Sequence, residues 1–210
     1  MGTRTSKTDA IGNLVTYTLD NWERVTAANY PDGSAHTFSY DADSNPTGFA
    51  DGTGTTTRAY DADNRMTSET RNGSTISYAY DGTGQIGLLS SETDQSGRVI
   101  SYAYTPRNAI SEVTDNAGST TYSYDGDGHV IGETLPNGCA VTNAYNSDGE
   151  LTSVANKSPE GTVLSSFAYA YNADEMRTGV TEADGSVVSY SYDAMNELTQ
   201  EVRTGTNAYS

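Results

Sequence analysis

The stretch TYSYDGDGHVIGETLPNG, residues 121–138, contains every part of the pattern that decides the fold. Tyr122 and Tyr124 alternate with a small residue, and such a two-residue period is produced by a β-strand and not by a helix. The turn formers Asp125–Gly128 follow, and Val130 opens a second apolar stretch. Asn137-Gly138 then predicts another turn. One unit therefore reads strand, turn, strand, turn.

This unit recurs through the whole chain. A two-residue anchor, usually Tyr followed by Asp or Asn, returns about every 22 residues: Leu19-Asp20, Tyr40-Asp41, Tyr60-Asp61, Tyr80-Asp81, Tyr104-Thr105, Tyr124-Asp125, Tyr145-Asn146, Tyr171-Asn172 and Tyr192-Asp193. An apolar residue that opens a return strand follows most anchors: Val25, Met66, Ile86, Ile110, Val130, Leu151 and Leu198. A glycine turn, such as Asp32-Gly33 or Asp184-Gly185, separates successive anchors. Nine repeats of one β-hairpin each predict about eighteen short antiparallel strands.

The anchor residues are assigned a structural role in joining these strands. They are Tyr40, Asp41, Tyr60, Asp61, Tyr80, Asp81, Tyr104, Tyr124, Asp125, Tyr145, Tyr171, Tyr192 and Asp193. We expect each Asp or Asn oxygen to accept hydrogen bonds from backbone N–H groups two residues further on. We expect each tyrosine hydroxyl to reach water or a polar partner, and the glycines to supply the positive φ of two-residue hairpin turns.

The two faces of the predicted strands differ. One face carries small residues such as Ser39, Ala79 and Ser123, whereas aromatic side chains line the other. The tyrosines that precede the anchors by two positions form a candidate binding face, because stacked rings offer flat platforms to sugars or partner proteins: Tyr78, Tyr102, Tyr122, Tyr169 and Tyr190. Repeat-to-repeat packing is the simpler interpretation of the same tyrosines.

These patterns predict an all-β protein made of consecutive antiparallel β-hairpins. A single sheet with one tyrosine face must curl or be covered, so we expect a long, curved, spiralling sheet that forms part of a shell. Residues 1–16 are expected to be an N-terminal lead-in or partial repeat, residues 17–205 an array of about nine repeats, and residues 206–210 a C-terminal tail. Wider anchor spacing predicts longer loops at Gly82–Leu89 and Asn156–Val163.

Composition and charge disfavour several classes of protein. Only 34% of the residues are apolar, which disfavours a large globular core, and the net charge of −17 repels nucleic acid and anionic membrane surfaces. No run is long enough for a membrane span. Cys139 is the single cysteine and cannot form an internal disulfide. The opening MGTRTSKTDAIGNLV lacks the apolar block of a signal peptide, which indicates a cytosolic protein or a piece of a longer chain.

The residues capable of chemistry are few. The D-x-D pairs that follow the anchors, such as Asp41/Asp43 and Asp125/Asp127, are interpreted as turn caps in preference to calcium ligands. His36 lies in phase with the aromatic face and is interpreted as a substitute ring, while His129 is expected to be an exposed turn residue. Cys139 has no identifiable base. We therefore assign no catalytic residue, no metal ligand and no cofactor, and an enzyme is the less favoured interpretation.

Four segments carry a resemblance to a known family: YDADSNPTGFADGTG (40–54), YDADNRMTSETRNGS (60–74), YDGDGHVIGETLPNG (124–138) and YNADEMRTGVTEADGS (171–186). They closely resemble the YD-repeat or RHS-repeat family, which includes the cocoon of toxin complexes, RHS polymorphic toxins, wall-associated proteins and teneurins. The resemblance covers residues 17–205 and implies a hollow casing. Leu19 and Thr105 depart from the anchor dipeptide, and Arg58 and Asn143 stand where most repeats have an aromatic residue. The self-cleaving segment that ends some RHS shells does not follow the last repeat.

The resemblance implies a non-enzymatic wall segment of a shell that encapsulates a toxin or cargo domain, or a cell-surface scaffold. The implied location is secreted or cell surface, and the partners are an enclosed cargo or adjacent repeats of a longer chain. A carbohydrate- or protein-binding adhesion module that uses the tyrosine face is the first alternative. A lyase or hydrolase acting on polysaccharide is the second. Open strand edges also suggest an edge-to-edge homo-oligomer.

Overall fold

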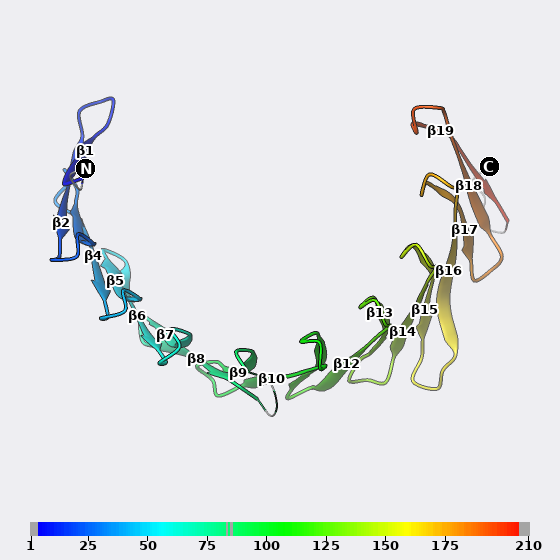
Figure 1. The fold of residues 1–210 in the computed structure, drawn as a ribbon, viewed down its shortest axis with the longest axis horizontal. Helices are drawn as coiled ribbons and strands as arrows, with labels where there is room; N and C mark the ends of the chain where they lie inside the picture. Colours follow the sequence, from blue (N-terminus) through cyan, green and yellow to red (C-terminus); the bar gives the residue numbers. More distant parts are fainter. Residues whose placement is uncertain (1–3, 83, 85, 206–210) are drawn as a thin grey trace. The chain divides into compact units, whose positions relative to one another are not determined.

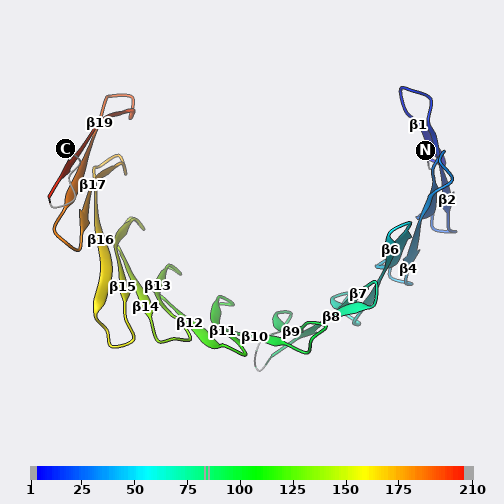
Figure 2. The same cartoon turned by 180° about the vertical axis from the view of Figure 1, so that it is seen from behind.

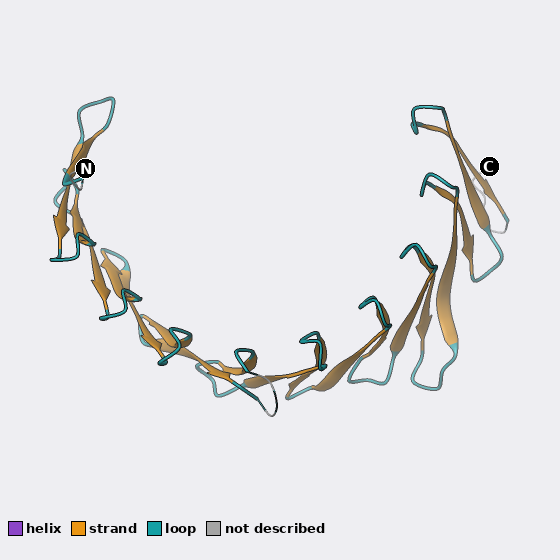
Figure 3. Ribbon diagram, viewed as in Figure 1, coloured by secondary structure: helices purple, strands orange, loops and turns teal. Residues whose placement is uncertain are grey.

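The computed structural model describes residues 4–82, 84 and 86–205 of the chain, so the expected tail at 206–210 lies outside the described residues. These residues form nineteen β-strands and no helix (Figures 1 and 3). Accordingly, no helix in the described ranges is long and apolar enough to cross a membrane. The all-β class and the consecutive antiparallel hairpins are confirmed.

The chain divides into two compact units, of which the first is Met1–Ser101. Its strands pair antiparallel in chain order, from β1 with β2 through to β9 with the first residues of β10. They are β1 (Ser6–Thr8), β2 (Leu14–Leu19), β3 (Val25–Asn29), β4 (Ala35–Tyr40), β5 (Pro46–Asp51), β6 (Gly54–Tyr60), β7 (Met66–Arg71), β8 (Ser74–Tyr80), β9 (Leu89–Thr93) and β10 (Val99–Tyr104). β1 lies within the expected lead-in.

The second unit is Tyr102–Ser210, and its strands also pair antiparallel in chain order from β11 to β19. They are β11 (Ile110–Asp115), β12 (Gly118–Tyr124), β13 (Val130–Thr134), β14 (Ala140–Tyr145), β15 (Leu151–Lys157), β16 (Val163–Tyr171), β17 (Arg177–Glu182), β18 (Val187–Tyr192) and β19 (Leu198–Thr204). Figure 2 shows the same strands from behind. In each unit the strands form a single layer.

The turn that begins at each anchor, called the anchor turn below, adds one residue to the return strand. In the turn after Tyr60 the register shifts between Ala59 and Tyr60, which marks a β-bulge. Asn64 has a φ of 62° there, a left-handed conformation that asparagine adopts more readily than most residues. The same fourth position is left-handed at Ser44, Asn108 and Gly128. Positive φ is therefore needed in the anchor turns as well as in the glycine turns.

The glycine turns differ in part from the prediction. A two-residue turn is present at Asn72-Gly73, where both φ values are positive (50° and 86°). At Gly33 the turn is longer, because the Gly33 N–H donates to the Tyr30 carbonyl and the Tyr30 N–H donates to the Ser34 carbonyl. Gly97, Gly138, Gly161 and Gly185 follow the longer form. The expectation of two-residue turns throughout was therefore wrong, although glycine does supply the positive φ.

The two expected loops also had different outcomes. The described residues between β8 and β9 carry no strand, so the loop at Gly82–Leu89 is present, but the return strand opens at Leu89 and not at Ile86, which is 95% exposed. The prediction of a longer loop at Asn156–Val163 was wrong. β15 continues to Lys157 and β16 begins at Val163, so the extra residues lengthen both strands of that hairpin. Paired strands can grow together without changing the turn.

The faces of the strands alternate as expected. In β4 the side chains of His36, Phe38 and Tyr40 are half-buried, while the residues between them are exposed. The described apolar residues that are fully buried are few: Ala28, Val180 and Val188. A single layer has little interior, so stability must come from contacts between neighbouring repeats along the sheet.

Candidate functional site

The anchor turns contain the most regular polar geometry in the molecule. One carboxylate oxygen of Asp41 accepts from the N–H groups of Asp43 (3.0 Å) and Asn45 (2.8 Å). The Asp41 N–H donates to the Asn45 carbonyl at 3.1 Å, which closes the turn. The same double acceptance occurs at Asp20, Asp61, Asp125, Asn146, Asn172 and Asp193. Asp and Asn therefore serve one purpose here, and Thr105 does so with longer bonds through its hydroxyl.

These hydrogen bonds predict a loss of stability in acid. The Asn45 side chain, together with backbone N–H groups, holds the pKa of Asp41 below its usual 3.8, and the backbone N–H of Arg65 does the same for Asp61. A carboxyl whose pKa is lower in the folded state stabilises the fold above its unfolded pKa. We expect the free energy of unfolding to fall as the pH drops below 3.8 toward the folded values. Urea unfolding at stepped pH measures this, and Asp61→Asn should flatten the dependence, since asparagine caps two native turns.

The anchor tyrosines link each repeat to the one before it. The Tyr80 hydroxyl donates to the Met66 carbonyl at 2.9 Å, and Met66 is the first residue of the preceding return strand. The same bond to the first residue of β3, β5, β11, β13, β15 and β17 is made by Tyr40, Tyr60, Tyr124, Tyr145, Tyr171 and Tyr192, over 2.6–3.3 Å. The backbone carbonyl is thus the polar partner that the hydroxyl was expected to reach.

Removing one such hydroxyl should have a moderate effect. The Tyr124 hydroxyl donates to the Ile110 carbonyl at 2.6 Å. Tyr124→Phe keeps the ring but removes the donor, so we expect the free energy of unfolding to fall by about 1 kcal/mol. Thermal and urea unfolding of the full chain measure the change. An unchanged stability would show that the hydroxyl contributes nothing at this junction.

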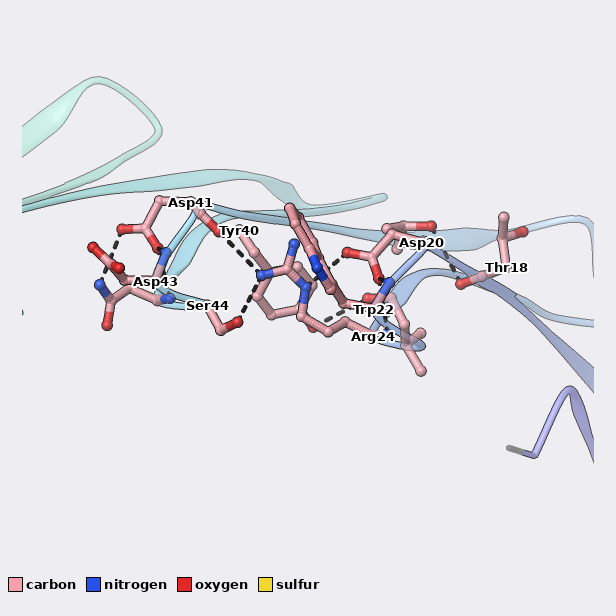
Figure 4. A network of polar contacts seen from close by, with 11 residues as sticks. Thr18, Asp20, Trp22, Arg24, Tyr40, Asp41, Asp43 and Ser44 are labelled. Carbon is pink, nitrogen blue, oxygen red and sulfur yellow. Dashed lines mark hydrogen bonds and ion pairs between the residues drawn. The ribbon is translucent and has the colours of Figure 1, made fainter. Parts of the chain in front are cut away.

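A second link comes from the fourth residue after the anchor Asp or Asn, which we call the bridging position. Arg24 occupies it in the first anchor turn (Figure 4). Its Nε pairs with Asp20 of its own turn at 2.7 Å, while Nη1 donates to the Asp41 carbonyl and the Ser44 hydroxyl of the next turn at 3.0 Å. The guanidinium lies 4.6 Å from both the Trp22 and the Tyr40 ring centroids. Arg24 therefore joins two repeats by ion pairing and cation–π contact.

Arg65 repeats this arrangement two turns later. Its Nε pairs with Asp61 at 2.8 Å, and its two amino groups reach both oxygens of Asp81 at 2.8 and 2.7 Å. The guanidinium lies 4.7 Å from the centre of the Tyr80 ring. The hydrogen bonds to Asp81 and then Asp61 raise the pKa of Arg65, so the charge is permanent. A bidentate pair that also stacks fixes the geometry of the junction.

Other bridging residues form such links without a guanidinium group. Asn45 bonds to Asp41 in its own turn and to Asn64 in the next, the latter at 2.6 Å. His129 pairs with Asp125 at 2.9 Å and stacks on the Tyr145 ring, with centroids 4.6 Å apart and planes inclined by 22°. His129 is thus half-buried in a junction, and its prediction as an exposed turn residue was wrong. The bridging position was not predicted from the sequence, where its only signal is a large polar residue five positions after several anchor tyrosines.

The candidate binding face lies on the half-buried side of the strands. Glu92 lies directly opposite Tyr78, and Glu133 directly opposite Tyr122. Burial, followed by the charge of the neighbouring glutamates, raises the pKa of both phenols, so neither is activated as a base. The structure places the five tyrosines in equivalent half-buried positions: Tyr78, Tyr102, Tyr122, Tyr169 and Tyr190.

The remaining candidates take structural positions. His36 contacts the Tyr30 and Phe49 rings edge-on, which confirms its interpretation as a substitute aromatic residue. Arg58 replaces a tyrosine and pairs with Glu69 at 2.7 Å. Asn143 donates to the Val130 carbonyl, and Cys139 is a half-buried free thiol.

One group of side chains in the described ranges could gather around a metal ion. The donor atoms of Asp125, Asp127 and His129 lie within 4.8 Å of one another. However, one oxygen of Asp125 caps the turn and the other pairs with His129. Turn capping and stacking therefore account for the positions of Asp125 and His129, and the cluster needs no ligand to explain it.

Comparison with protein-family models gives two matches. A model described as Teneurin YD-shell matches residues 5–140, and a model described as RHS Repeat matches residues 171–208. No curated protein sequence matches the chain. The two family matches together extend over most of the anchors described above.

Solved structures also resemble the chain. The crystal structure of TcdB2-TccC3-Cdc42 is 14% identical, with a TM-score of 0.58 over 93% of this chain and 12% of that one. The crystal structure of TcdB2-TccC3 is 14% identical, with a TM-score of 0.52 over 94% of this chain and 13% of that one. At this identity the likeness concerns the fold alone. The chain spans about an eighth of the length of these structures.

Proposed function

The chain belongs to the teneurin YD-shell family, and from this premise we propose that it is a non-enzymatic wall segment of a shell that encloses a protein cargo. The observation that carries the proposal is that the anchor side chains bond to the backbone of the sheet itself. Seven anchor tyrosines donate a hydroxyl hydrogen bond to the preceding repeat. The anchor Asp or Asn caps its own turn. These contacts join repeats into one surface, which is what a wall requires. The family resemblance supports a location outside the cell or on its surface as part of this proposal.

Enclosure can be tested in the native polypeptide that carries this chain. A segment held inside a shell should resist added protease, and paired substitutions of the anchors Tyr80→Ala and Tyr124→Ala should make it sensitive. The matched control is Ala79→Ser, which changes an exposed residue on the small-residue face. Electron microscopy of the same samples shows whether the wall is intact. Enclosure would be contradicted if the segment were cleaved equally fast in the wild type, whose wall is intact, and in the variant, whose wall is open.

Adhesion through the tyrosine face stays the alternative proposal. Arg177 lies over Tyr169 and Tyr190, at 5.8 and 5.2 Å from the ring centroids, so two of the five rings already have a stacking partner. Tyr102→Ala on a glycan affinity gel tests whether the tyrosine face binds sugar. If the glycan slows migration of the wild type but not of a folded Tyr102→Ala variant, adhesion is favoured over the enclosing role.

A further inference from the structure

One bridging position differs from the others. In the anchor turn that starts at Thr105 it is Ala109, whose methyl group is too short to reach the next anchor. The other regular turns carry a longer side chain at this position: Arg24, Asn45, Arg65, His129, Glu150, Met176 and Glu197. The ring that Ala109 would cover belongs to Tyr124. Among the described residues, no cation or aromatic ring stacks on Tyr124, whereas Arg24, Arg65 and His129 cover Tyr40, Tyr80 and Tyr145.

A hollow of about 440 Å³ lies where the missing side chain would be. Pro106 and Ala109 of one anchor turn line it, together with Tyr124, Asp125 and Asp127 of the next repeat. This volume lies within the range of roughly 300–1,000 Å³ that small-molecule sites occupy. The hollow therefore has an aromatic platform, apolar neighbours and carboxylates within one junction between repeats.

We propose that this hollow binds the guanidinium group of an arginine side chain from a partner protein, stacked on the Tyr124 ring. The proposal goes beyond the enclosing role, because a wall requires no ligand at one junction. The filled junctions show which chemistry fits. At the Tyr80 junction a guanidinium lies 4.7 Å from the ring centre and pairs with three aspartates.

The charges at the hollow favour a cation. The Asp127 carboxylate is exposed and accepts no hydrogen bond from the described residues, so it can receive a guanidinium N–H. The face of a tyrosine ring attracts cations, and the net charge of −17 draws them toward the chain. Arginine suits the site better than lysine, since its planar group both stacks and donates in a fork.

Arg107 also lines the hollow and acts against a cation. Its Nη1 donates to the Gly126 carbonyl of the next turn, which holds its positive charge at one side of the site. The proposal therefore predicts the sign of a substitution. Arg107→Gln should strengthen the binding of an arginine probe, whereas a carboxylate ligand would be weakened by the same change.

The test is a titration of the full chain with Nα-acetyl-arginine methylamide, followed by two-dimensional NMR. We expect saturable shifts near Tyr124, binding at least several-fold tighter than for the lysine analogue, and a further gain of about threefold in Arg107→Gln. Ala109→Arg fills the hollow from within the chain. It should abolish binding and raise the unfolding temperature by about 2–4 °C. Ala103→Arg, which adds the same charge at an exposed position, should leave binding intact.

Several outcomes would overturn the proposal. Equal binding by wild type and a folded Ala109→Arg chain would place the probe elsewhere. Tighter binding of Nα-acetyl-glutamate methylamide would assign the hollow to an anion held by Arg107, and tighter binding of methyl glucoside would assign it to a sugar. If Ala109→Arg fails to fold by circular dichroism, the sign of the Arg107→Gln effect decides, because that substitution alters a surface side chain.

Discussion

Replacing Tyr80 with alanine is expected to lower the free energy of unfolding by about 3 kcal/mol, the lower end of the range for aromatic residues replaced by alanine. Three contacts disappear together. The hydrogen bond from the Tyr80 hydroxyl to the Met66 carbonyl is lost, and so is the ring on which the Arg65 guanidinium lies. The half-buried face of β8 also buries less apolar area. Urea unfolding of the full chain measures the total, and hydrogen exchange shows whether β7 and β8 open first.

Two matched variants separate these contributions. Tyr80→Phe keeps the ring and should cost only about 1 kcal/mol. Tyr124→Ala removes an anchor on which no cation lies among the residues that the structure describes. It should therefore cost less than Tyr80→Ala by the contribution of the stack. A double-mutant cycle with Arg65→Ala should show favourable coupling to Tyr80. Equal losses for Tyr80→Ala and Tyr124→Ala would mean that the Arg65 stack does not stabilise the junction.

The hairpins could be predicted because they depend on residues that are close in sequence. Alternation sets each strand, and the Asp after the tyrosine accepts hydrogen bonds from N–H groups two and four residues ahead. Local information of this kind was sufficient for the order and direction of the strands. It was not sufficient at Asn156–Val163, since extra residues can extend two paired strands or enlarge a loop, and only cross-strand pairing decides between them.

The links between repeats were missed for a different reason. Arg65 and Asp81 are sixteen residues apart and meet only because one anchor turn stacks beside the next. No single repeat contains this contact. His129 was misplaced in the same way, since its partner ring Tyr145 belongs to the following repeat. Only when the stacking is known can the bridging positions of successive repeats be compared, and Ala109 is then the one with the smallest side chain.

The glycine turn that contains Gly54 is in close contact with the next glycine turn at Asn72, and this leads to the second large prediction. Gly54→Ala is expected to cost about 3 kcal/mol, from steric overlap and backbone strain together. A methyl group at Gly54 would lie 1.9 Å from the Oδ1 atom of Asn72. That oxygen accepts from the Thr55 N–H at 2.9 Å and cannot move without losing the bond. The φ of +151° at Gly54 is also one that side-chain-bearing residues rarely adopt.

The neighbouring glycine provides the control for this prediction. A methyl group at Gly52, two residues earlier in the same turn, meets nothing within 4 Å, so Gly52→Ala should change stability by less than about 0.5 kcal/mol. Asn72→Gly removes the obstructing side chain while tolerating the positive φ of 50° at that position. The double variant Gly54→Ala/Asn72→Gly should therefore lose less than the sum of the single changes. Strictly additive losses would mean that strain at Gly54, and not contact between adjacent turns, accounts for the effect.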